Sequence, residues 1–347
     1  MKALLICGSL NQTKMMVQIS RHLPQFDVYF TPYFCDGPGR LIQRTGLLDF
    51  TVLGGRFHRQ TVDYLAREGV TCDYEGLNGP YDLVVTCSDL IVPGRIRGSK
   101  LVLVQEGMTD PENLVYHMVR TLRLPRWLAQ TSTTGLSDAY DLFCVASEGY
   151  RELFVRKGAR PEKIRVTGIP NFDHCDTYRH NDFPHRNFVL VATSDMRETF
   201  KYENRRRFIE KARRIADGRP LIFKFHPNEN PRRAAREVER YAPEAMHFAE
   251  ANTDHMIANC DVLVSRYSSV VYVAAALGKE IHCDLAREEV QRLLPWQNGG
   301  TSAARIAEQC LTLFERAHPG RRRPATKTAS FGTRLRSRIA EARKAVR

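Results

Sequence analysis

Two acidic residues follow short apolar runs in the first half of the chain. Glu106 comes directly after residues 100–105 and precedes Gly107, and Asp89 follows a similar run. A carboxylate at the carboxyl end of a strand can act as a general base toward a hydroxyl group. Two such groups on neighbouring strand ends can have their pKa values pushed apart by burial and mutual repulsion. Capping of the following turn is an equally good interpretation of both.

A second candidate group ends an apolar run in the second half of the chain. Lys224 and His226 are two residues apart, so on an extended chain both side chains point to one side, and Pro227 ends the strand there. An imidazole at such an edge can donate to a phosphate oxygen or polarise a leaving group. A lone His is more often structural, but Lys-x-His-Pro at a strand end favours a functional role.

Three loops have the composition of anion sites at helix starts. Small residues let backbone N–H groups approach an anion there, and a neighbouring Lys or Arg adds charge. The residues are Gly8, Ser9 and Lys14 in the first loop, Thr193, Ser194 and Arg197 in the second, and Arg266, Ser268 and Ser269 in the third. An ordinary turn or serine cap explains each loop alone. Several of them on one edge indicate a diphosphate ligand.

The elements that must position these residues alternate along the chain. Unbroken apolar runs, typical of parallel strands covered on both faces, alternate with helix-period segments. They predict strands at residues 3–7, 26–31, 83–86, 100–104, 142–145, 163–167, 188–192, 221–225, 262–264 and 280–283. The repeated strand–helix order predicts an α/β fold of two doubly wound, Rossmann-like domains, with ligands bound in a cleft at the carboxyl ends of the strands.

The length of 347 residues suits two domains of ordinary size. The alternation breaks at a polar stretch that contains three His, which is typical of a linker. The predicted divisions are an N-terminal domain (1–170), a linker (171–187), a C-terminal domain (188–316) and a basic tail (317–347).

The net charge of +13 is concentrated in the tail. Between Arg316 and Arg347 there are eleven Lys or Arg and one acidic residue, so the rest of the chain is nearly neutral. Residues 331–346 have the pattern of a basic amphipathic helix. Such a helix can pack on the body of the protein, lie on an anionic membrane surface or contact nucleic acid, which is the least favoured of the three.

The remaining composition limits the location and chemistry of the protein. Nine cysteines lie singly without a CxxC pair, which fits reduced thiols in a cytosolic protein. No window approaches about eighteen uncharged apolar residues, and the N-terminus has the pattern of a first strand and not of a signal peptide. We expect a cytoplasmic protein, peripheral at most at the inner membrane face, that uses no metal and no cofactor.

Taken together, these landmarks resemble enzymes of the GT-B fold. In the first half, the first loop, the two acidic strand ends and the approach to the linker are similar to non-hydrolysing UDP-GlcNAc 2-epimerases. In the second half, Phe225-His226-Pro227 and Tyr267-Ser268-Ser269 are similar to CDP-glycerol glycerophosphotransferases and to bacterial transferases that use CMP-activated sugars. The resemblance implies that His226, Ser268 and Ser269 contact the donor phosphates and that Glu106 or Asp89 is the base. It also implies an acceptor role for the first domain and a nucleotide-donor role for the second.

Two departures from the epimerases favour a transferase. Leu10 stands where they carry an Arg, and residues 270–275 contain no carboxylate to hold a ribose. The first hypothesis is therefore a transferase that moves a sugar or glycerol-phosphate unit from a nucleotide-activated donor to a glycan or lipid-linked acceptor of the cell envelope. The alternatives are a nucleotide-sugar 2-epimerase and a non-catalytic binder of nucleotide sugars or polyanions.

Overall fold

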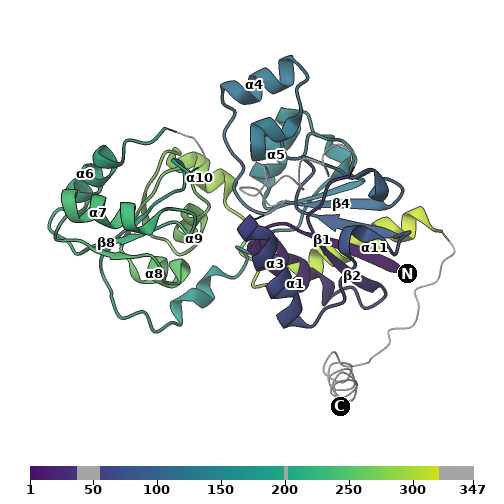
Figure 1. Ribbon diagram of the computed structural model, residues 1–347, viewed down its shortest axis with the longest axis horizontal. Helices are drawn as coiled ribbons and strands as arrows, with labels where there is room; N and C mark the ends of the chain where they lie inside the picture. The colour runs from purple at the N-terminus through teal and green to yellow at the C-terminus, as the bar shows by residue number, and fades with distance from the viewer. Residues whose placement is uncertain (37–54, 199–201, 320–347) are drawn as a thin grey trace, which may run out of the picture. The chain divides into compact units, whose positions relative to one another are not determined.

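A computed structural model describes residues 1–36, 55–198 and 202–319 of the chain (Figure 1). They form two compact units. Unit 1 comprises Met1–Val145, Leu153–Asn171 and the described residues from Thr301, and unit 2 comprises Ala146–Glu152 and Phe172–Gly300. The predicted amphipathic helix at 331–346 lies outside the described residues, as does almost all of the basic tail.

Unit 1 is built on a parallel sheet of six strands. Its order is β2-β1-β3-β4-β5-β6. The strands are β1 (Lys2–Cys7), β2 (Asp27–Pro32), β3 (Leu83–Thr86), β4 (Lys100–Val104), β5 (Leu142–Val145) and β6 (Ile164–Val166). Nearly every residue of the inner strands is buried, which is why they are unbroken apolar runs in the sequence.

Helices and short 3₁₀ segments connect these strands. The helices are α1 (Leu10–Ser20), α3 (Gly55–Glu68), α4 (Leu114–Thr121), α5 (Glu148–Lys157) and α11 (Ser302–Ala317). The first residues of α5, up to Glu152, belong to unit 2, and α11 follows unit 2 in the chain. The 3₁₀ segments are η1 (Tyr74–Gly76), η2 (Gly94–Ile96), η3 (Arg126–Thr133) and η4 (Pro161–Lys163). A serine cap begins α1 and an asparagine cap begins α4, because Ser9 and Asn113 each accept a backbone N–H of the first turn of their helix.

Helix α11 belongs to unit 1, although the sequence predicted residues up to 316 in the second domain. It packs against α1 and β4. Its Phe314 ring meets the ring of Phe26 edge to face, with the centroids 5.5 Å apart. An apolar helix face shows that a helix is covered, but it does not show which sheet covers it. The polar segment predicted as a linker packs with unit 2 from Phe172, and its Cys175 is buried in η5 (Cys175–Arg179).

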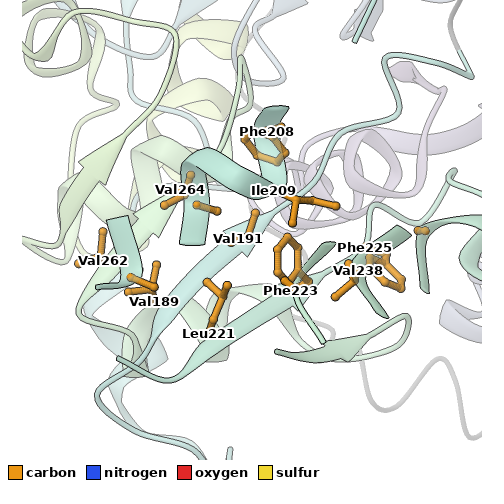
Figure 2. Close-up of a cluster of buried hydrophobic side chains, with 14 residues drawn as sticks. Val189, Val191, Phe208, Ile209, Leu221, Phe223, Phe225, Val238, Val262 and Val264 are labelled. Carbon is orange, nitrogen blue, oxygen red and sulfur yellow. The ribbon is translucent and has the colours of Figure 1, made fainter. Parts of the chain in front are cut away.

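Unit 2 is a parallel sheet of five strands in the order β11-β10-β7-β8-β9. The strands are β7 (Val189–Ala192), β8 (Leu221–Lys224), β9 (Met246–Phe248), β10 (Val262–Val264) and β11 (Glu280–His282). The helices are α6 (Arg205–Ala216), α7 (Pro231–Tyr241), α8 (Thr253–Asn259), α9 (Val270–Ala276) and α10 (Arg287–Leu293). Figure 2 shows the core between β7, β8, β10 and the helices α6 and α7. The predicted α/β class with two doubly wound sheets is confirmed.

None of the helices in the described part of the chain combines the length and the apolar run that a bilayer crossing needs.

Candidate functional site

Each sheet has one point at which the strand order reverses. In unit 1 the chain passes from β1 to β2 on one side and then to β3 on the other. In unit 2 the equivalent strands are β7 at the centre, β8 on one side and β10 on the other. The carboxyl ends of the strands at such a switch point are the usual ligand site of an open α/β sheet. The predicted loops after β1, β7 and β10 all begin there.

Glu106, two residues after β4, is hydrogen-bonded to the loop and helix that follow β1. Its Oε1 accepts from the Ser9 hydroxyl at 2.7 Å, and its Oε2 accepts from Gln12 Nε2 at 2.6 Å. Ser9 also accepts the backbone N–H of Gln12 at 3.2 Å and so caps α1. Two donors therefore fix a half-buried carboxylate at the switch point of unit 1. Each oxygen keeps a lone pair that can accept a proton from a hydroxyl group.

Gln12 is a site residue that the sequence prediction missed. Its side chain is buried, and its Oε1 has no hydrogen-bond partner among the described residues. A buried acceptor without a partner calls for an explanation, and a ligand hydroxyl or amide group would supply one. The only signal in the sequence is a polar residue on the first turn after the Ser9 cap.

Asp89 is fully buried and bound inside unit 1. Arg126 lies 3.1 Å from its Oδ2, and the backbone N–H groups of Gly135 and Ser137 donate to its two oxygens at 3.0 Å. The Arg126 guanidinium also donates to the Asp89 carbonyl oxygen at 2.7 Å. These contacts connect the end of β3 to the segment that leads into β5. The carboxylate thus has a clear structural use.

The other residues of the first loop hold the backbone or face solvent. The Gly8 carbonyl oxygen accepts from Thr61 of α3 at 2.9 Å. Lys14 is exposed on α1, on the second turn of the helix. Burial raises the pKa of the neighbouring Cys87 thiol well above its usual value, and the charge of Glu106 adds to that increase. Cys87 therefore stays protonated and is a poor nucleophile.

His226 follows β8 in a turn that fixes the orientation of its ring. Its Nδ1 accepts the backbone N–H of Asn228 at 3.2 Å, so the proton of the neutral ring lies on Nε2. Asp195, on the loop after β7, lies 3.7 Å from Nδ1 and accepts from the Asn228 side chain at 2.9 Å. The side chain is about a third exposed. Nε2 has no hydrogen-bond partner among the described residues and is ready to donate to an oxygen.

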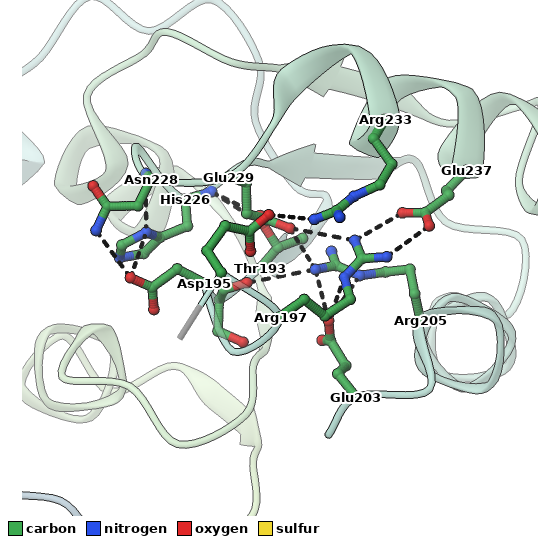
Figure 3. Close-up of polar contacts among 12 residues, drawn as sticks. Thr193, Asp195, Arg197, Glu203, Arg205, His226, Asn228, Glu229, Arg233 and Glu237 are labelled. Atoms are coloured by element: carbon green, nitrogen blue, oxygen red, sulfur yellow. Dashed lines mark hydrogen bonds and ion pairs between the residues drawn. The ribbon is translucent and has the colours of Figure 1, made fainter. Parts of the chain in front are cut away.

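The backbone of His226 is held by a buried acid. Its N–H donates to Thr193 Oγ1 at 3.0 Å and to Glu229 Oε2 at 3.1 Å, and the Thr193 hydroxyl donates to the same carboxylate (Figure 3). Arg205, also buried, ion-pairs with Glu229 and with Glu203. Thr193, a predicted phosphate contact, therefore supports the His226 turn. The sequence prediction missed Glu229 and Arg205. The one signal in the sequence that could have indicated them is that Glu229 follows His226 by three residues.

Arg197, predicted on the anion rim, is bound by carboxylates. It pairs with both oxygens of Glu237 at 2.7 and 2.9 Å and lies 3.5 Å from Glu203 and 3.7 Å from Glu229 (Figure 3). Hydrogen bonding to Glu237 raises the pKa of Arg197 further. This guanidinium is neutralised by the protein, so it offers less charge to a ligand than the sequence suggested.

Lys224 and Ser194 are both buried. Lys224 Nζ donates to the carbonyl oxygens of Phe225 and Ala249 at 2.7 and 3.1 Å, and desolvation lowers its pKa. Its ammonium group thus joins the end of β8 to the segment after β9. Ser194 lies two residues after the switch-point strand β7, and its hydroxyl has no partner among the described residues. Of these two side chains, Ser194 is therefore the one whose hydroxyl can donate a hydrogen bond to a ligand.

The serine loop after β10 begins α9. Ser268 and Ser269 are half-buried, and Ser269 stands at the N-cap without a side-chain capping bond. Arg266 pairs with Asp284 at 2.6 Å. Ser265, which the prediction did not single out, donates to the Ala192 carbonyl oxygen at 3.0 Å and bridges β10 to β7. This bond places the serine loop beside Thr193 and Ser194.

Two cavities in the structure are lined by other residues. One of about 230 Å³ lies among α4, η3 and α5 in unit 1, and one of about 450 Å³ lies among α9, β11 and α10 in unit 2. Neither is lined by Glu106, His226 or the serines of the third loop. Among the described residues, no group of three or more His, Cys, Asp and Glu is arranged to hold a metal ion.

No family model and no curated protein matches this sequence. Solved structures do match. A UDP-N-acetylglucosamine 2-epimerase is 14% identical over 94% of this chain and 99% of its own, with a TM-score of 0.54. A UDP-GlcNAc 2-epimerase from Neisseria meningitidis bound to UDP-GlcNAc is 12% identical over 90% of this chain and 100% of its own, with a TM-score of 0.55.

A variant of the Wall Teichoic Acid Polymerase TagF is 10% identical over 91% of this chain and 89% of its own, with a TM-score of 0.50. These identities are low enough that the likeness concerns the fold alone. Both kinds of enzyme have the GT-B fold, as the sequence resemblance implied. The chain thus has two parallel α/β sheets of the GT-B kind.

Proposed function

We propose that this chain is a transferase that moves a sugar or polyol-phosphate unit from a nucleotide-activated donor to a hydroxyl group of a glycan or lipid-linked acceptor. The observation that carries the proposal is the turn after β8. The Asn228 N–H occupies His226 Nδ1 and leaves an N–H at Nε2, in the part of unit 2 where the Ser194 hydroxyl also lacks a partner. Donors without partners, fixed by a buried network, suit the phosphate oxygens of a leaving nucleotide.

In this proposal the two units carry different parts of the reaction. Glu106 of unit 1, fixed by Ser9 and Gln12, takes the proton of the acceptor hydroxyl as that oxygen attacks the donor. His226, Ser194, Ser268 and Ser269 of unit 2 stabilise the negative charge that develops on the departing phosphate. The supporting residues Glu229, Arg205 and Asp89 position backbone and do not touch the reactants.

A 2-epimerase is the second candidate, because the two epimerase structures match almost the full length of this chain. Against it, α9 consists of Val, Tyr and Ala and offers no carboxylate to a ribose. The third candidate, a non-catalytic binder of nucleotide sugars, needs no fixed base, and the hydrogen-bonded Glu106 favours the enzymes over it.

The test is a thermal-shift panel of CMP, CDP, UMP, UDP, GDP and AMP on the native chain and on His226→Ala. A nucleotide that binds only the folded chain raises its melting temperature, by an amount equivalent to about 2.7 kcal/mol at a hundredfold excess over Kd. We expect stabilisation by a cytidine nucleotide that His226→Ala loses. His185→Ala, a half-buried histidine just before β7, is the matched control and should keep it. Stabilisation by UDP alone would favour the epimerase, and no shift with any nucleotide would contradict the phosphate site.

A further inference from the structure

Exposed apolar side chains gather on one short stretch of unit 1. Of the eleven large apolar side chains exposed in the described part of the chain, seven lie within residues 114–128, on α4 and the start of η3. They are Leu114, Val115, Met118, Leu122, Leu124, Trp127 and Leu128. Leu114 is 75% exposed, Leu122 61% and Trp127 50%. We call these seven side chains the α4–η3 surface.

The fold of unit 1 does not need this surface. The inner side of α4 is already packed, because Tyr116 and Val119 are buried against Ala129 of η3. In Figure 1, α4 stands outside the sheet of unit 1. A helix that is apolar on its inner and its outer side is normally covered on both. Apolar groups gathered in this way on a folded protein mark an interaction site.

The charges within the surface are positive, and two acids, Asp110 and Glu112, precede it in the chain. Residues 114–128 contain three arginines and no acidic residue. Arg120, Arg123 and Arg126 line the cavity of about 230 Å³, together with the buried Lys157 and the edge of the α4–η3 surface at Leu124.

The three arginines differ in what they contact. Arg120 donates to the Tyr116 hydroxyl at 3.0 Å and to the Lys157 carbonyl oxygen, neither of which carries charge. Arg126 is paired with Asp89. Arg123 is exposed and has no ion pair within the described ranges. The positive charge of Arg120 and Arg123 is therefore not neutralised by a carboxylate of the protein.

We propose that the α4–η3 surface docks on the face of an anionic lipid bilayer. Leucine, methionine and tryptophan side chains would enter the boundary between head groups and acyl chains, where tryptophan is favoured. Arg120 and Arg123, which line the cavity, would contact the head-group phosphates. A protein partner would also suit the apolar groups, but exposed arginines that no carboxylate of the protein pairs with complement a phosphate-covered surface. The proposal depends neither on the basic tail nor on the proposed reaction.

The first experiment measures co-sedimentation of the full-length chain with vesicles of phosphatidylcholine and phosphatidylglycerol. We expect the double variant Leu114→Ser/Leu122→Ser to bind at least tenfold more weakly than the native chain, because it removes two of the most exposed apolar groups. Leu77→Ser is the matched control, since Leu77 is a leucine of unit 1 that is 64% exposed and lies outside the surface. Circular dichroism melts check that all variants fold.

The second experiment uses Trp127 as a reporter. The chain has two tryptophans, so Trp296→Phe leaves Trp127 alone. On binding, its emission should move to shorter wavelength and be quenched by lipids brominated in the acyl chain. Arg123→Gln should weaken binding several-fold and reduce its salt dependence, and Arg97→Gln, which changes another exposed arginine of unit 1, should not.

Three results would overturn the proposal. The first is that the native chain does not bind anionic vesicles. The second is that the double variant binds as well as the native chain, which would assign binding to another part of the protein. The third is that Trp127 stays in water while the native chain forms a dimer that the double variant cannot form, which would make the surface an interface between proteins.

Discussion

Glu106 is held by two side-chain donors that leave its remaining lone pairs to a substrate. If it is the base, Glu106→Gln should lower turnover by roughly 10²–10⁴-fold, because the amide cannot take the acceptor's proton. Donor binding, measured by thermal shift, should be kept, since the donor site is assigned to unit 2. The measurement is turnover with the nucleotide that the panel identifies. Glu68→Gln, a change of another half-buried glutamate of unit 1, is the control, and equal turnover in all three proteins would contradict the role of Glu106.

Lys157 allows a prediction about pH. It is 3% exposed, donates to the Ser132 carbonyl oxygen and packs on the Tyr116 ring, and burial lowers its pKa to about 8. In the unfolded chain this lysine has a pKa near the usual value of about 10.4. Between about pH 8 and 10 it therefore keeps its proton in the unfolded chain and loses it in the folded one. Stability due to this group should therefore rise as the pH increases from about 8 to 10.

The comparison that isolates this effect is with Lys157→Met. The free energy of unfolding of the native chain should gain roughly 1–3 kcal/mol relative to the variant between pH 7.5 and 10.5. Urea unfolding at several pH values measures it. Parallel stability curves for the two proteins would show that the ammonium group is not desolvated.

At the scale of elements, Asp89 ties the end of β3 to the segment before β5 through Arg126 and two backbone N–H groups. Asp89→Asn should destabilise the chain by roughly 1–3 kcal/mol, because an amide nitrogen in place of one buried carboxylate oxygen leaves a donor of Arg126 or of the 135–137 backbone without its acceptor. Asp138→Asn is the control. Asp138 also forms ion pairs, but it is 41% exposed, so its loss should cost less than about 1 kcal/mol. Urea unfolding distinguishes the two, and equal costs would contradict the structural role of Asp89.

The elements that the sequence predicted best are those fixed by local pattern. The apolar runs at 83–86, 100–104, 142–145 and 262–264 coincide with β3, β4, β5 and β10. Strand β9 was missed, since Met246-His247-Phe248 is a short edge strand with no apolar run, and Met246 is exposed. Burial on both faces leaves a mark in the sequence, whereas an edge strand is set by the neighbour that pairs with it.

The candidate site was predictable only in part, for a similar reason. Glu106 and His226 follow recognisable apolar runs, so their strand-end positions could be predicted. Gln12, Glu229 and Arg205 owe their roles to partners that are distant in sequence or to a turn whose shape no local pattern specifies. The same limit explains Arg197. Its three carboxylate partners come from residues 203–237 and neutralise the charge that its loop in the sequence suggested would be free for a ligand.

At the scale of the whole molecule, the chain leaves unit 1 to build unit 2 and returns with α11 to complete unit 1. Helix α11 has 16 residues, of which Ile306, Cys310 and Phe314 are among the buried ones, and Phe314 packs on Phe26. The sequence prediction assigned this helix to the second domain, because the apolar face of a helix does not indicate which sheet it packs against. Unit 1 is therefore complete only when residues far apart in the chain have met.

This connectivity can be tested with one tryptophan in each unit, Trp127 in unit 1 and Trp296 in unit 2. Phe314→Ala should destabilise unit 1 by roughly 3–5 kcal/mol through the cavity that it leaves. In urea unfolding, the single-tryptophan chain that keeps Trp127 should show an earlier transition, and the one that keeps Trp296 should change little. Phe223→Ala, in the core of unit 2, should produce the reverse. If both reporters move together in both variants, the two units unfold as one cooperative body, and the helix that closes unit 1 stabilises the whole chain.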